Sequence, residues 1–158
     1  MKKYILNAVF VASLAVGLTA CFENPNMIYD GPAVVEFDAA VTTAPAAGRT
    51  YPLVTVANGA GKIKTRINLV GPQRPTAESI KVVVDTQNST AVAGTHYRLT
   101  SETVSIPANT SFGELEVEIL AAPVQAGTTV NLVLMLEGNG GEIKASENFK
   151  RLGWTIRL

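Results

Sequence analysis

The chain has little of the chemistry that disulfides, metal centres and covalent catalysis require. Its 158 residues include one cysteine, Cys21, and one histidine, His96. A lone cysteine cannot form a disulfide within the chain, and a thiolate metal site needs several such ligands. The fold must therefore be stabilised by packing alone.

An excess of positive charge is also absent. Thirteen basic residues are balanced by thirteen acidic residues, and no stretch of the chain gathers lysine and arginine into a patch. Proteins that bind a phosphate backbone concentrate positive charge on one face. We therefore expect no nucleic-acid partner.

The first twenty residues have the layout of an export signal. Lys2 and Lys3 precede the apolar stretch Tyr4–Gly17, which is shorter than the roughly 20 residues that a membrane-spanning helix needs. No flank of the stop-transfer kind follows this stretch. We interpret residues 1–20 as a leader whose removal leaves 138 of the 158 residues, a length that suits one domain.

The end of this leader, Leu18-Thr19-Ala20-Cys21, resembles the bacterial lipobox, whose cysteine is acylated and becomes the new N-terminus. The resemblance implies several acyl chains on Cys21, and stable anchoring takes about two hydrophobic signals. A secreted protein with a cysteine at this position by chance is the alternative, because ordinary signals need only small residues before the cut. Residues 21–31 show neither a helical nor a strand period, and we predict that they form a tether between the membrane and the domain.

Beyond the tether, apolar and polar residues alternate in short runs, which is the period of a half-buried strand. In Glu114–Ile119 three carboxylates alternate with three aliphatic side chains, so one face of that strand is expected to be wet. Val130–Leu136 is apolar on both faces, which predicts a central strand covered from both sides or a partner contact. The predicted strands are Ala33–Phe37, Pro52–Ala57, Lys62–Leu69, Ile80–Asp85, Thr103–Ile106, Glu114–Ile119, Val130–Leu136 and Leu152–Leu158.

Clusters of glycine, proline and asparagine separate these strands. Among them Asn58-Gly59 predicts a tight hairpin turn, because both residues tolerate a positive φ. Short strands at this spacing, without an amphipathic helix of useful length, are typical of a two-sheet sandwich. We predict an all-β, immunoglobulin-like sandwich of about seven to eight strands over residues 32–158.

Three segments resemble a known motif: Ala91–Tyr97, Thr103–Thr110 and Glu114–Leu120. Together they are similar to the Calx-beta motif, as carried by Bacteroidota outer-membrane lipoproteins with one immunoglobulin-like domain, a group of uncharacterised function. The resemblance implies a sandwich fold and a place near glycan-uptake or adhesion machinery of the outer membrane. It leaves open whether the domain faces the cell surface or the periplasm.

The calcium-binding branch of that family uses clustered carboxylates, because calcium takes six to eight oxygen ligands. Here His96 stands where the pattern has an acidic residue, and no acidic cluster follows Ile119. Asp85 remains as one carboxylate, and one carboxylate does not make a site. We therefore predict neither a metal site nor a cofactor.

Two groups of residues are candidates for catalysis. His96 lies beside Tyr97 in a turn that contains glycine, but a general base needs a positioned partner, so a turn residue bonded to the backbone is favoured. Glu114, Glu116 and Glu118 have the spacing of paired catalytic carboxylates. All three share one exposed strand face with no sign of a cleft, which favours a solvated surface.

Aromatic residues are few, at 6% of the chain, and sugar-binding modules use such rings as stacking platforms. Trp154 alternates with Leu152 and Ile156, which predicts a core position. Tyr51 and Phe112 lie next to loops and are the candidates for an exposed ligand contact, with His96 and Tyr97 as further contacts.

The leading hypothesis is a membrane-anchored, non-enzymatic binding or accessory lipoprotein of the cell envelope, which assists glycan capture or contacts a partner protein at the outer membrane. The alternative is a pilus or adhesin-stalk subunit that assembles by β-strand exchange, motivated by the apolar strands Val130–Leu136 and Leu152–Leu158. An enzyme is the reading that the sequence supports least.

Overall fold

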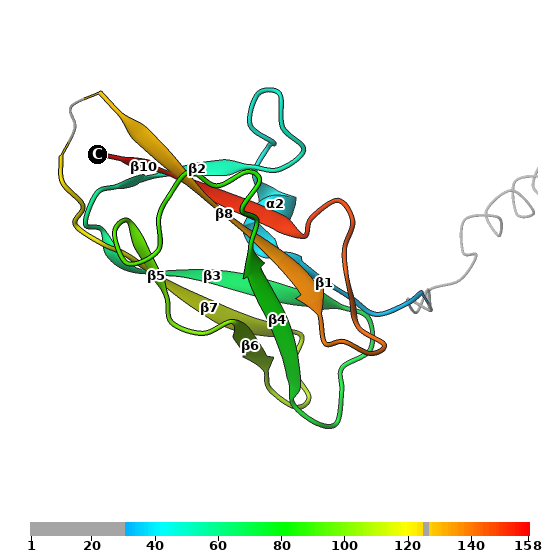
Figure 1. Cartoon of the computed structure of the whole chain (residues 1–158). Helices are drawn as coiled ribbons and strands as arrows, with labels where there is room; N and C mark the ends of the chain where they lie inside the picture. Colours follow the sequence, from blue (N-terminus) through cyan, green and yellow to red (C-terminus); the bar gives the residue numbers. More distant parts are fainter. Residues whose placement is uncertain (1–30, 125–126) are drawn as a thin grey trace, which may run out of the picture.

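The computed structural model describes residues 31–124 and 127–158. The predicted leader, the predicted acylation site Cys21 and the predicted tether up to Asp30 lie outside this part of the chain. Two five-stranded sheets pack face to face (Figure 1), with strand orders β5-β7-β3-β1-β9 (sheet A) and β2-β10-β8-β4-β6 (sheet B). The prediction of an all-β, two-sheet sandwich is confirmed.

The eight predicted strands all form, with ends that differ from the prediction by a few residues. Two further strands, β5 and β9, have three and two residues, which is too short for an alternating pattern to show. The elements are β1 (Val34–Phe37), α2 (Asp38–Thr42), β2 (Leu53–Ala57), β3 (Gly61–Val70), β4 (Glu78–Val84), β5 (Tyr97–Leu99), β6 (Thr103–Ile106), β7 (Phe112–Ile119), β8 (Thr129–Gly138), β9 (Lys144–Ala145) and β10 (Arg151–Arg157).

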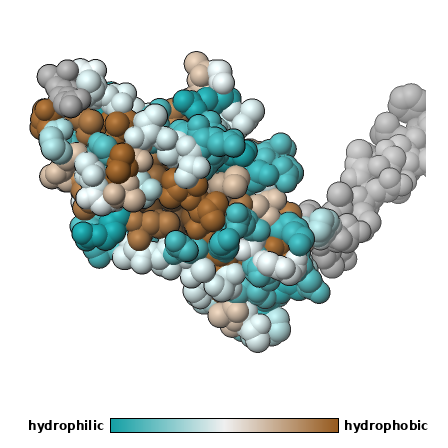
Figure 2. Space-filling view, in the orientation of Figure 1, coloured by the Kyte–Doolittle hydropathy of each residue, from teal (hydrophilic) through white to brown (hydrophobic). Residues whose placement is uncertain are grey.

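The core lies between the sheets and follows from the alternation. Leu115, Val117 and Ile119 of β7 are each at most 2% exposed, and burying one such aliphatic side chain stabilises the fold by roughly 1.5–3 kcal/mol. Trp154 of β10 is 5% exposed and belongs to this core, as predicted. Figure 2 shows apolar atoms near the middle of the face seen in Figure 1, between β8 and β7.

Strand β8 is the central strand of sheet B and pairs with β10 on one side and β4 on the other. Leu132 and Leu134 face the core, and Val133 between them is also 0% exposed. A Cβ at Gly153 would overlap Leu53 Cδ2 and lie 3.2 Å from Val133 Cγ2, so the Leu53 and Val133 side chains meet over this glycine. The prediction of a central strand covered from both sides is thus confirmed.

The predicted Asn58-Gly59 hairpin is wrong. Strand β2 belongs to sheet B and pairs in parallel with β10, whereas β3 belongs to sheet A. Gly59 does take a positive φ of 69°, and the Asn58 amide bonds both backbone groups of Ala122 at 2.8 and 2.9 Å. The pair forms a corner that crosses between the sheets, because a turn residue sets the local φ and does not choose the partner strand.

Within residues 31–124 and 127–158, no helix has the length and hydropathy needed to cross a membrane.

Candidate functional site

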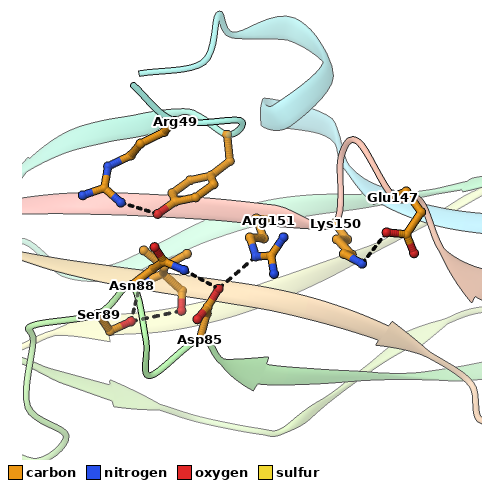
Figure 3. A network of polar contacts seen from close by, with 9 residues as sticks. Arg49, Asp85, Asn88, Ser89, Glu147, Lys150 and Arg151 are labelled. Atoms are coloured by element: carbon orange, nitrogen blue, oxygen red, sulfur yellow. Dashed lines mark hydrogen bonds and ion pairs between the residues drawn. The ribbon is translucent and has the colours of Figure 1, made fainter. Parts of the chain in front are cut away.

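A hollow of about 590 Å³ opens on the outer face of sheet B. The loop before β2 forms one wall, and the loop after β4 and the first residue of β10 form the other. Its lining includes the side chains of Arg49, Tyr51, Asn88 and Arg151. Figure 3 shows Arg49, Asn88 and Arg151 with the buried carboxylate that bonds the last two.

That carboxylate is Asp85, which is only 8% exposed. Its Oδ2 accepts a hydrogen bond from Arg151 Nε at 2.8 Å and another from Asn88 Nδ2 at 3.0 Å. Burial by itself raises the pKa of Asp85, but the bonds from Asn88 and Arg151 outweigh burial and hold the pKa below its ordinary value. Asp85 is therefore ionised at neutral pH and fixes both side chains.

The sheet places this pair. Arg151 lies opposite Met135, and Val84 lies opposite Leu134, so the Arg151 side chain crosses the outer face of β8 to reach Asp85. Of the three guanidinium nitrogens of Arg151, only Nε makes a hydrogen bond to another described residue. The terminal nitrogens of its guanidinium line the hollow without a hydrogen-bond partner in the described residues.

The segment that carries Asn88 is pinned to β8 by its neighbours. Ser89 Oγ accepts from the backbone N–H of Val133 at 2.9 Å, and Thr90 Oγ1 accepts from that of Asn131 at 2.9 Å. Strand β4 ends at Val84, so it does not pair with this part of β8. The two hydroxyls accept the hydrogen bonds that the backbone N–H groups of β8 would otherwise donate to a neighbouring strand. Asn88 is thus held on a rigid part of the fold.

The opposite wall is a turn at residues 46–51. Arg49 N–H donates to the Ala46 carbonyl at 2.9 Å, and Ala46 N–H donates to the Tyr51 carbonyl at 3.0 Å. Arg49 Nη1 donates to the Tyr51 hydroxyl, and its guanidinium carbon lies 5.5 Å from the ring centroid. The phenol therefore orients the Arg49 guanidinium at the edge of the hollow.

Residues 53–153 match the model of a family described as a domain of unknown function, DUF4843. The chain belongs to this family. No protein with a curated description matches the chain.

Two solved structures resemble this DUF4843 chain. One is CBD12 from CALX1.2, with a TM-score of 0.57, 16% identity, and 78% of this chain matched to 43% of that one. The other is described as a candidate carbohydrate-binding protein from Bacteroides ovatus, with a TM-score of 0.51, 10% identity, and 78% of this chain matched to 36% of that one. The chain spans less than half of either structure, and at these identities the likeness shows the fold alone.

The DUF4843 fold does not bring the predicted contact residues together. Tyr51 is 5% exposed, so the expectation of an exposed contact is wrong: the turn folds the ring inward, and it forms a wall of the hollow. Phe112 is 47% exposed, as expected, but it lies on sheet A under the Arg66 guanidinium, 4.5 Å from its centroid.

His96 and Tyr97 belong to the fold. His96 Nδ1 accepts from the backbone N–H of Val92 at 2.9 Å, which confirms the predicted turn role. Tyr97 is 6% exposed and packs in the core, where burial raises the pKa of its phenol. Neither residue lines the hollow.

The three glutamates of β7 form a solvated face, as predicted. Glu114, Glu116 and Glu118 pair with Lys64, Lys62 and Arg98 at 3.0, 2.8 and 2.9 Å. Across the described ranges, no three side chains of histidine, cysteine, aspartate or glutamate gather in a way that could hold a metal ion.

Sequence reasoning missed Arg49, Asn88 and Arg151. The available signal was a pair of opposite charges, Asp85 at the end of one apolar strand and Arg151 at the start of another. The two charges can be recognised as an ion pair only when β4, β8 and β10 are known to be neighbouring strands.

Proposed function

We propose that the chain is a membrane-anchored, non-enzymatic binding lipoprotein of the outer membrane that assists glycan capture, with the hollow on sheet B as its binding site. The observation that carries the proposal is that the lining side chains are fixed before any ligand arrives. Asp85 holds two of them, Tyr51 orients a third, and Ser89 and Thr90 pin the loop. Such preorganisation lowers the entropy that binding must overcome.

The chemistry of the hollow supports binding in preference to catalysis. Its charged groups are guanidiniums, which do not release protons at physiological pH. The carboxylate of Asp85 accepts two hydrogen bonds and has a lowered pKa, which suits an ion-pair partner and not a general base near neutral pH. The likeness to a candidate carbohydrate-binding protein of Bacteroides ovatus is in keeping with this role.

The location rests on residues 18–21, where the lipobox resemblance supports acylation of Cys21. An acyl anchor and the tether up to residue 31 would keep the sandwich close to the membrane while leaving its faces open. The proposal covers the surface-exposed and the periplasm-facing orientation alike.

The alternative, a stalk subunit that exchanges strands, depends on the apolar strands Val130–Leu136 and Leu152–Leu158 being open to a neighbouring subunit. In the structure β10 pairs with both β8 and β2, and β8 pairs with both β10 and β4. Neither strand offers an open edge to a neighbouring subunit. We therefore develop the binding role alone.

The test uses the full chain, purified from membranes in detergent and applied to a glycan array. We expect retention on a subset of glycans, and a protein that binds none contradicts the role in glycan capture. In a parallel arm Cys21→Ala should move the protein from the membrane pellet to the soluble fraction. A variant that stays in the pellet contradicts the lipid anchor.

A further inference from the structure

We infer that the hollow on sheet B selects acidic glycans, which carry a carboxylate or a sulfate on the sugar ring, through the guanidinium groups of Arg49 and Arg151. This inference rests on the proposed glycan-binding role and adds the class of ligand. It follows from the charge of the lining, from its hydrogen-bonding groups and from the position of its one aromatic ring.

The charge of the hollow is positive. Its lining contains two guanidinium groups, those of Arg49 and Arg151, and no carboxylate. The buried Asp85 carboxylate balances one of these charges from behind. Glu147, which Figure 3 also shows, is bound by Lys150 at 2.7 Å and interacts with Arg151, so the Lys150–Glu147 pair adds no net charge and leaves the Arg49 guanidinium without a carboxylate. One positive charge is left to attract an anion.

The hydrogen-bonding groups suit an oxyanion on a polyhydroxylated ring. Arg49 uses Nη1 for the Tyr51 hydroxyl and Arg151 uses Nε for Asp85, and the other guanidinium nitrogens have no hydrogen bond within the described chain. A planar guanidinium fork matches carboxylate and similar oxyanions with two parallel bonds. Because ionised Asp85 only accepts, Asn88 must point its nitrogen at Asp85, which leaves Oδ1 to accept from a sugar hydroxyl.

A neutral sugar fits this lining poorly. Modules for neutral glycans rely on open aromatic faces, whereas Tyr51 is 5% exposed and the Arg49 guanidinium lies over its ring. A neutral ring would also cover the Arg49 charge without supplying a counter-charge, which costs free energy. The same features favour a ligand with negative charge.

The experiment titrates the full chain in detergent with a hexuronate oligosaccharide and with the same oligosaccharide after methyl esterification. Esterification removes the charge and keeps the sugar, and we expect it to weaken binding roughly tenfold, the effect of one charge-assisted hydrogen bond. A sulfated neutral oligosaccharide forms a third arm. Tighter binding of that ligand than of the hexuronate would assign sulfate as the oxyanion and would support the same inference.

Arg49→Gln tests the site. This variant leaves the Asp85–Arg151 pair in place, and we expect it to weaken hexuronate binding about tenfold with little change for the methyl ester. Arg66→Gln is the matched control, because Arg66 is also a guanidinium over an aromatic ring, 4.5 Å from the Phe112 centroid, but on sheet A. It should change hexuronate affinity less than about twofold.

The outcomes distinguish a failure of the acidic-ligand inference from a failure of the proposed glycan-binding function. Equal affinity for hexuronate and ester, or an Arg49→Gln variant that binds hexuronate as wild type does, overturns the acidic-ligand inference while any glycan binding keeps the proposed function. Absence of binding to every glycan overturns both. Arg49→Lys guards against a folding defect: with an unchanged melting temperature and partial recovery of hexuronate binding it supports the inference.

Discussion

Ion pairs cross the outer faces of both sheets, but a pair on sheet A and a pair on sheet B differ in how far they are buried. On sheet A the Lys64–Glu114 pair at 3.0 Å has side chains that are 62% and 59% exposed. On sheet B the Arg151–Asp85 pair at 2.8 Å joins a side chain that is 33% exposed to one that is 8% exposed. Exposed ion pairs contribute little to the stability of the fold because water competes for both partners. Removing one partner of a buried pair is costly because it leaves the other charge buried and uncompensated.

The difference has a structural origin in the loops. On sheet A the alternating outer residues of β3 and β7 face solvent directly. Oppositely charged side chains of the two strands form ion pairs there. On sheet B the side chains of Asn88, in the loop after β4, and of Arg151 bond the buried Asp85, and a hollow lies between that loop and the turn at residues 46–51. Loops fixed on a rigid sheet are the usual place for binding side chains. The buried Asp85–Arg151 pair therefore supports the proposed site on sheet B better than the row of surface pairs would support one on sheet A.

The largest effect is expected from Asp85→Ala. The change removes the acceptor of Arg151 Nε and Asn88 Nδ2, and we expect it to lower the free energy of unfolding by about 2–3 kcal/mol, since Arg151 can partly turn to solvent. Urea unfolding of the wild type and the variant measures this loss of stability. The comparison requires that Glu114→Ala shifts the urea midpoint much less, and equal shifts for the two variants would contradict it.

Gly153→Ala tests how tightly sheet B is covered. A methyl group at this position of β10 would overlap Leu53 Cδ2 and lie 3.2 Å from Val133 Cγ2, so overpacking should destabilise the fold by about 1–2 kcal/mol. Gly141→Ala is the matched control, because its Cβ would meet only Asn139 Oδ1, at 3.5 Å. Thermal or urea unfolding of both variants measures the difference. Equal losses of stability for the two variants would disprove the close packing of Leu53 and Val133 over Gly153.

The third effect is a dependence on pH. Because the pKa of Asp85 is lower in the folded protein than in the unfolded chain, its contribution to stability is present above the unfolded pKa of about 4 and is lost as the pH falls through the folded pKa. The loss is smaller than for Asp85→Ala, since a protonated carboxyl still fills the space. We expect Asp85→Asn to lose less stability than wild type between neutral and acidic pH, and parallel profiles would refute this.

Much of the fold was predictable from local pattern. Alternation located eight strands and placed Trp154 in the core, because which face a residue occupies is encoded in its immediate neighbours. The partner of a strand depends on contacts with residues far away in the sequence. The parallel β2–β10 pairing and the corner at Asn58-Gly59 were therefore not predictable from the turn residues. Strands β5 and β9 are too short to show any period.

The site was less predictable for the same reason. Arg49, the Asp85–Asn88 segment and Arg151 come from three places in the chain, and only the order β2-β10-β8-β4 makes them neighbours. Tyr51 was expected to be exposed because it lies beside a loop, yet that loop folds back over it. Polar residues that act across strands leave no local pattern, in contrast to apolar ones that pack in layers.

The smallest effect is expected on sheet A. Glu114→Gln replaces the charged acceptor of Lys64 with a neutral amide, but Lys64 lies directly opposite Glu116 in the β3–β7 register and can move to it. The shared carboxylate and the solvent replace most of what is lost, so the urea midpoint should move by no more than the error of the fit, and less still at high salt. A double-mutant cycle with Lys64→Gln measures the pair itself. A coupling energy as large as that of Asp85 with Arg151 would show that exposure does not distinguish the two faces, and the reason for placing the site on sheet B would weaken with it.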